Sequence, residues 1–254
     1  MWSIETVFAC RLREGDTLES IENAFRPYLG RMKELKRLQT FHFSSLRRQA
    51  CLNLMGRGND DVVDLAVPTI NAEMLSKDGT LRGSFRAFQG FLVTHMGKHQ
   101  QHAKFTIENG WDSSAKDFPG TILNPMDIFT KGLSCLAAAR ETKNRTFEKA
   151  GRACRSRIKL WAKRGHPNSL HYEFALDAEF EALKGRNQSA RKNYEIAIGL
   201  ALGSGVLQDV GLLSERKCCF GRKTHLVQEF PVYSIVFSPA ILHNSFSKGM
   251  VSST

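Results

Sequence analysis

The chain has 254 residues, and its 36 Lys and Arg against 25 Asp and Glu give it a formal net charge of +11. With 42% hydrophobic residues it can bury a sizeable core. The sequence has no run of about 18 apolar residues, which excludes a membrane-spanning helix. Acidic Glu5 and the lack of a basic leader argue against a signal peptide. Six cysteines without a CxxC pair favour reduced thiols, so we expect a cytoplasmic protein.

Divergent helical repeats are predicted over residues 1–110. Apolar spacing indicates a helix over residues 1–13, a turn at Gly15 and a second helix over residues 17–25 that Pro27 ends. Three further helices are expected, over residues 33–55, 61–67 and 69–76.

A helical hairpin is predicted over residues 80–109, with its turn at Gly97. His95, His99 and His102 would face one way on a single continuous helix, as a zinc site requires. A turn at Gly97 separates His95 from the other two, and no fourth ligand is near. We therefore interpret these histidines as a polar hairpin tip and expect no metal. Residues 111–124 are polar and punctuated by Pro and Gly, which predicts a loop.

Four long helices, packed as consecutive antiparallel pairs, are predicted over residues 125–218. Pro125 suits a helix start, Gly185 suits the left-handed residue that closes a helix, and Asn187 suits the cap of the next one. The small residues Ala150 and Ala190 lie about 40 residues apart, which indicates an internal repeat.

Ala190, Tyr194, Ala197 and Ala201 form one stripe, at offsets of four, three and four. Small residues let two helices approach closely, and the tyrosine ring fills the groove beside them. This pattern is typical of a helical hairpin, and we expect Tyr194 and Trp161 to be buried.

The second helical pair predicted within residues 125–218 resembles a tetratricopeptide repeat. Gly185 is followed by Ala190, Tyr194 and Ala197, in the order of that family's second helix. A broader series is similar to the helical-repeat region of large multi-module signalling ATPases of the STAND and AAA types. The residues that carry this resemblance are Trp161, Lys163, Gly165, Pro167, Asn168, His171, Ala178, Glu179, Glu215 and Arg216.

The resemblance covers residues 85–220 and, loosely, residues 1–84. It implies an α-solenoid, with the ATPase module itself absent from this chain. Because the chain opens inside a repeat, we expect a fragment of a longer protein or a truncated gene model. Residues 221–254 include the β-branched and aromatic run VYSIVF and do not continue the helical period, which predicts an irregular or disordered tail.

The helix predicted over residues 143–164 is strongly basic, with nine Lys and Arg against one Glu. A solvated face usually alternates its charges, so a one-sided helix makes an anionic partner plausible. RNA, an acidic protein and a lipid surface remain open, although no aromatic residues are interleaved for base stacking. A merely solvated face is the other interpretation. The residues expected to face this partner are Arg152, Arg155, Arg157 and Lys159.

The sequence therefore predicts an all-α solenoid of about five antiparallel hairpins that acts as an interaction or regulatory scaffold. His171, Phe174 and Glu181 are expected to line its concave groove. We expect no catalytic residues and no cofactor, since the chain lacks a phosphate-binding loop and carries no nucleophile signature. A nucleic-acid-binding repeat and a non-catalytic part of an ATP-dependent enzyme are the alternatives.

Overall fold

The computed structural model describes residues 2–117, 121 and 123–219, and all regular structure within them is helical. The predicted all-α class is therefore confirmed for this part of the chain. The elements in chain order are α1 (Trp2–Glu14), α2 (Leu18–Glu34), α3 (Leu38–Leu54), α4 (Ala72–Lys77), α5 (Gly79–His95), α6 (His99–Asn109), α7 (Ser113–Asp117), α8 (Leu123–Thr142), α9 (Arg145–Lys163), the 3-10 helix η1 (Pro167–Ser169), α10 (Leu170–Leu183), α11 (Asn187–Gly203) and α12 (Leu207–Cys219).

Local sequence signals place several of these helix ends. The side chain of Asn144 caps α9 by accepting a hydrogen bond from the backbone N–H of Thr146, at 2.8 Å. Gly97 and Gly185 have φ of +68° and +75°, the left-handed conformation that a closing glycine adopts without strain. The cap of α11 is Arg186 and not Asn187, so that prediction was wrong by one residue.

Two predicted helix boundaries near the N-terminus were wrong. Helix α2 continues through Pro27 to Glu34, since its buried residues Ile21, Phe25 and Met32 lie on both sides of the proline. Helix α3 begins at Leu38, because the chain turns at Lys36, which has a φ of +53°.

Of the two helices predicted over residues 61–67 and 69–76, the first is absent and the second is present as the shorter α4. The preceding loop is held by the side chain of Asn53, whose Nδ2 donates to the carbonyl oxygens of Val62 and Asp64 at 3.0 and 2.6 Å. These bonds satisfy backbone groups that a helix would have paired internally. The loop predicted over residues 111–124 contains α7 and the start of α8. The tail predicted over residues 221–254 lies outside the described residues.

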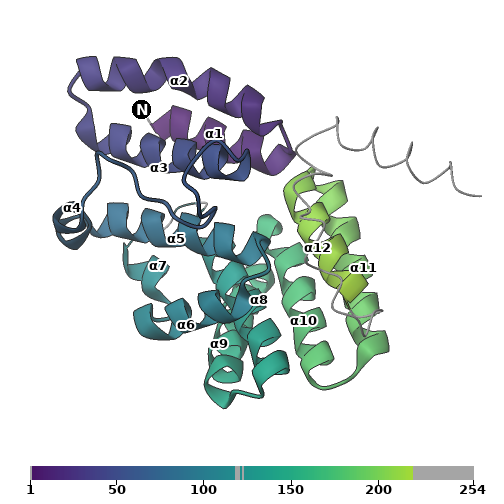
Figure 1. Ribbon diagram of the computed structural model, residues 1–254. Coiled ribbons are helices and arrows are strands. Elements are labelled where there is room, and N and C mark those ends of the chain that lie inside the picture. The colour runs from purple at the N-terminus through teal and green to yellow at the C-terminus, as the bar shows by residue number, and fades with distance from the viewer. Residues whose placement is uncertain (1, 118–120, 122, 220–254) are drawn as a thin grey trace, which may run out of the picture.

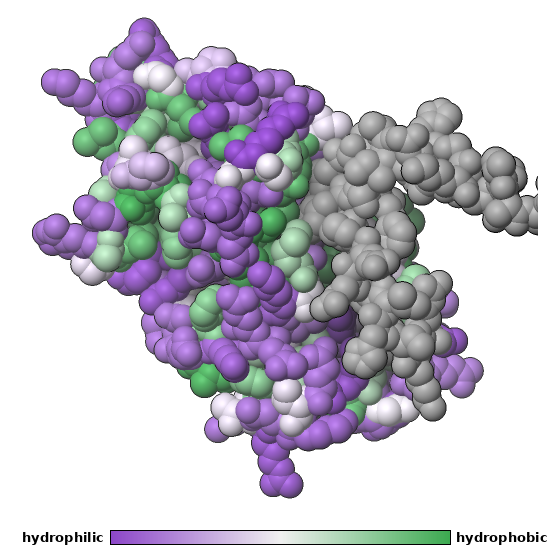
Figure 2. Space-filling model, viewed as in Figure 1, coloured by the Kyte–Doolittle hydropathy of each residue, from purple (hydrophilic) through white to green (hydrophobic). Residues whose placement is uncertain are grey.

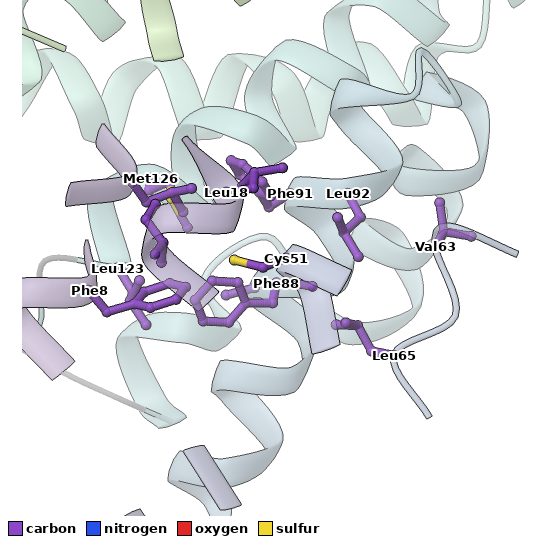
Figure 3. Packing of buried hydrophobic residues seen from close by; sticks show 14 of the residues in the cluster. Phe8, Leu18, Cys51, Val63, Leu65, Phe88, Phe91, Leu92, Leu123 and Met126 are labelled. Carbon is purple, nitrogen blue, oxygen red and sulfur yellow. The ribbon is translucent and has the colours of Figure 1, made fainter. Parts of the chain in front are cut away.

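The N-terminal helices enclose an apolar cluster. Phe8 of α1 meets Phe25 of α2 edge to face at 5.1 Å between ring centroids, and Phe88 of α5 at 6.5 Å. Figure 3 shows the rings of Phe8 and Phe88 close together, with Cys51 of α3 beside them.

Helix α8 is the central helix of the C-terminal half. Every residue from 126 to 139 is buried, because α5, α6, α9 and α10 all pack against it. Gly132 and Gly151 allow close approach at the α8–α9 contact: a Cβ on Gly132 would lie 2.9 Å from Cβ of Cys154, and one on Gly151 would lie 2.7 Å from Cγ of Leu136.

Helices α8 and α9 pack as one consecutive pair, and α10 and α11 as the next, as predicted; α12 adds a fifth helix that packs against α11. Ala178, Ala190, Tyr194 and Ala197 are fully buried, which confirms the prediction for Tyr194. Trp161 is only half-buried, so the prediction that it is buried was wrong. Gly165, in the turn that follows α9, has a φ of +82°.

The first helix also contacts the last described one, as Figure 1 shows. A Cβ on Gly15, just after α1, would lie 2.9 Å from Cβ of Leu207 at the start of α12. On the face seen in Figure 2, hydrophilic residues surround smaller hydrophobic patches over the N-terminal helices.

None of the helices in the described ranges is long and apolar enough to cross a bilayer.

Candidate binding face on helix α9

The outward side of α9 carries a row of cations. Its members are exposed and recur at offsets of four, three, seven and four, so they lie on one stripe of the helix. We call this set the α9 row: Arg145, Lys149, Arg152, Lys159 and Lys163. From first to last it spans about 27 Å at the rise of an α-helix.

Acidic neighbours reach only two members of the row. Arg152 pairs with Glu148 at 2.5 Å, and Lys159 lies 3.6 Å from Glu173 and 3.9 Å from Asp177 of α10. Within the described residues, Arg145, Lys149 and Lys163 have no carboxylate within 4.0 Å. The row therefore retains a surplus of positive charge that faces solvent.

The other two predicted surface cations are used inside the fold. Arg155 pairs with Asp177 of α10, and its guanidinium lies 4.5 Å from the centroid of the Phe180 ring. Arg157 lies between two indole rings, 5.7 Å from Trp111 and 6.0 Å from Trp161. The expectation that these two arginines are fully solvent-facing is corrected: both are only partly exposed, because Asp177 and Phe180 of α10 contact Arg155 and the two tryptophans contact Arg157.

Of the three predicted groove residues, His171 is buried, whereas Phe174 and Glu181 are partly exposed. His171 is only 1% exposed and its Nε2 lies 2.9 Å from Oδ2 of Asp209, so it is not available to a partner, which corrects that expectation. Phe174 is half-buried against the core, and Glu181 pairs with Arg186 at 3.0 Å. Their side chains serve the packing of α10 against its neighbours.

A buried polar cluster, missed from the sequence, lies between α5, α6, α8, α10, α11 and α12. At its centre, Oε1 of Glu179 accepts hydrogen bonds from the Tyr194 hydroxyl at 2.5 Å and from Nε of Arg216 at 2.7 Å. Arg216 also donates to Nε2 of His99 at 2.9 Å. We call the following set the polar junction: Thr94, His99, His102, Ser134, Glu179, Tyr194 and Arg216.

Burial keeps the imidazoles in this region neutral. It lowers the pKa of His95 to about 4 and the pKa of His102 to about 3, and it lowers the pKa of His99 well below its usual range. The turn at Gly97 places His95 on α5 and the other two on α6, as predicted. The described residues contain no group of three or more side chains arranged to hold a metal ion.

A sequence signal for the junction did exist. Ser134 falls within a run of small and apolar residues, a position where an unpaired polar group is costly. Such residues point to buried partners, but helical periodicity does not identify those partners.

The chain was compared with family models, curated proteins and solved structures, and nothing matches it in any of the three.

Proposed function

We propose that this protein is an interaction module whose α9 row docks an acidic segment of a partner protein. The observation that carries the proposal is the set Arg145, Lys149 and Lys163, three exposed cations on one stripe without a carboxylate near them in the described residues. The fold pairs Arg155 with Asp177 and sets Arg157 against two indole rings, yet it leaves these three exposed cations without a carboxylate, so α9 presents a defined positive surface.

An acidic protein segment fits this surface better than RNA does. The row carries no aromatic side chain on which a base could stack, and single-stranded recognition depends on such stacking. A partner helix with carboxylates at offsets of three and four would match the spacing of the row.

We further propose that residues 125–220 work as a tetratricopeptide-like scaffold within a larger signalling ATPase, acting through binding and not through chemistry. The pairing of α8 with α9 and of α10 with α11, with Ala178, Ala190 and Ala197 fully buried, supports this interpretation.

A charge-reversal experiment tests the docking site. Arg145, Lys149 and Lys163 are replaced by Glu in the full chain, and binding of a poly-glutamate peptide is measured by fluorescence anisotropy at low salt. The matched control reverses three exposed cations elsewhere, Lys33, Lys104 and Lys192, so both variants change the net charge by the same amount.

We expect the row variant to bind about tenfold or more weakly, while the control stays within about threefold of the wild type. Equal weakening in both variants would show that only net charge matters. Tighter binding of a uridine oligomer than of poly-glutamate by the wild-type chain would favour RNA and overturn the proposal.

A further inference from the structure

A cavity of about 330 Å³ is lined by residues of α4, α5, α6, α7 and α8, and none of its lining residues belongs to α9. Leu75, Phe85 and Phe105 supply apolar walls, and His102 and Lys131 add polar groups. A pocket of this size that combines apolar walls with convergent polar groups has the form of a small-molecule site.

The polar junction fixes which nitrogen of His102 carries its proton. Arg216 can only donate, so Nε2 of His99 accepts, and the neutral His99 ring carries its proton on Nδ1 and donates it to Oγ of Ser134 at 3.3 Å. The hydroxyl protons of Ser134 and Thr94 then each need an acceptor.

Those two hydroxyls lie 3.0 Å apart, and both approach Nδ1 of His102, Thr94 at 2.7 Å and Ser134 at 3.2 Å. If Nδ1 of His102 carried a proton, the hydroxyls would have only each other as acceptors, and one hydroxyl proton would lack a partner. Nδ1 therefore accepts, and the proton of the neutral ring is on Nε2.

This Nε2–H is the donor that His102 offers to the cavity. His102 is 2% exposed, and no side chain or backbone group of the described residues pairs with its Nε2. The atom lies over the open side of Gly90, where a Cβ would approach it to 2.4 Å. Both residues line the cavity, and a larger residue at position 90 would displace the imidazole.

Lys131 contributes a second donor. Its Nζ pairs with Oδ2 of Asp127 at 2.6 Å and donates to Oγ of Ser113 at 2.9 Å, which leaves one of its three N–H groups for a ligand. Arg86 adds a cation to the lining, since its only ion pair in the described residues is a long one to Asp117, at 3.7 Å.

We propose that this cavity binds a small organic acid, whose carboxylate accepts hydrogen bonds from Nε2–H of His102 and from Lys131. Its apolar body would lie against Phe85 and Phe105, and Arg86 would attract the anion. The proposal goes beyond docking on α9, because it uses different helices and a different class of ligand, and neither result depends on the other.

The test uses the full chain labelled with ¹⁵N at histidine, with benzoate and hexanoate as probes and benzylamine as the cationic counterpart. In the free protein, long-range ¹H–¹⁵N spectra should show His102 protonated on Nε2 and His99 protonated on Nδ1. Either carboxylate should bind saturably and shift the Nε2 resonance of His102, and benzylamine should leave it unchanged.

Gly90→Ala should weaken benzoate binding about tenfold or more, by displacing the imidazole from the cavity wall. The matched control is Gly199→Ala on α11, where a Cβ meets open space, and it should bind as the wild type does. If Gly90→Ala fails to fold, Arg86→Gln replaces it, with a weakening of about threefold or more expected from the lost cation.

A proton on Nδ1 of the free His102 would overturn the proposal. So would the absence of saturable binding by both acids, equal binding of benzylamine, or unchanged affinity in the cavity variant that folds.

Discussion

Positive charge is used in two different ways in the α9 row and in the polar junction. In the junction, Arg216 is 6% exposed and donates hydrogen bonds to Glu179 and His99, which are both buried. In the row, Lys149 and Lys163 are exposed and unpaired within the described residues. Because a buried charge must be compensated while an exposed one need not be, the first serves the fold and the second is free for a partner.

The largest effect is expected at the centre of the junction. Glu179→Ala should lower the free energy of unfolding by about 3–5 kcal/mol, since it leaves the Arg216 charge buried without its counter-ion. Urea unfolding of the full chain measures this. A loss below about 1 kcal/mol would mean that the pair contributes little and that the comparison with the row fails.

The next largest loss of stability is expected from overpacking the contact between α10 and α11. Ala190→Leu or Ala197→Leu should destabilise the fold by about 1–3 kcal/mol, because both alanines are fully buried and a larger side chain forces α10 and α11 apart. Gly199→Ala, on the same helix α11 but in open space, is the control and should be neutral or slightly stabilising. Unchanged denaturant midpoints for both leucine variants would disprove this account of the α10–α11 contact.

The buried histidines should make the fold sensitive to acid. Their folded pKa values lie below the ordinary 6.5, so their contribution is present above about pH 6.5 and is lost as the pH falls toward the folded values. Each histidine should remove about 1.4 kcal/mol of stability per pH unit in that window.

The pH effect is measured as the slope of the unfolding free energy against pH. His102→Gln should reduce that slope by about one proton relative to the wild type. A slope that does not change would show that His102 is not held neutral in the folded protein.

The smallest effects on stability are expected on α9 itself, where cations that contact the fold should differ from cations of the exposed row. Arg155→Ala should cost about 1 kcal/mol, since it removes the Asp177 pair and the contact with the Phe180 ring. Lys149→Ala should change stability by less than about 0.5 kcal/mol. If Lys149→Ala costs as much as Arg155→Ala, the row is part of the fold and not a free surface.

The sequence predicted most of what depends on neighbours along the chain. The glycine turns at Gly97 and Gly185 follow from local backbone chemistry and were confirmed. The prediction that α2 ends at Pro27 was wrong, because buried residues on both sides of the proline pack against the core and continue the helix.

The candidate sites were harder to predict, because they depend on residues far apart in sequence. The basic character of α9 was evident from the sequence. Which of its cations are exposed was not, because Asp177 and Phe180 of the next helix contact Arg155. Trp111, which contacts Arg157, lies 46 positions before it. The pairing of His99 with Arg216 spans 117 positions. No periodicity reports such a contact, so the junction and the cavity beside it required the three-dimensional structure.

The most direct test of the central claim maps where an acidic segment binds. The full chain labelled with ¹⁵N is titrated with a poly-glutamate peptide of about 20 residues, long enough to follow the 27 Å row. We predict that the largest backbone shifts fall on Arg145, Lys149, Arg152, Lys159 and Lys163, and that they diminish as salt is added. Shifts of equal size on the exposed cations of α11, Arg191 and Lys192, or no shift along α9, would contradict the account.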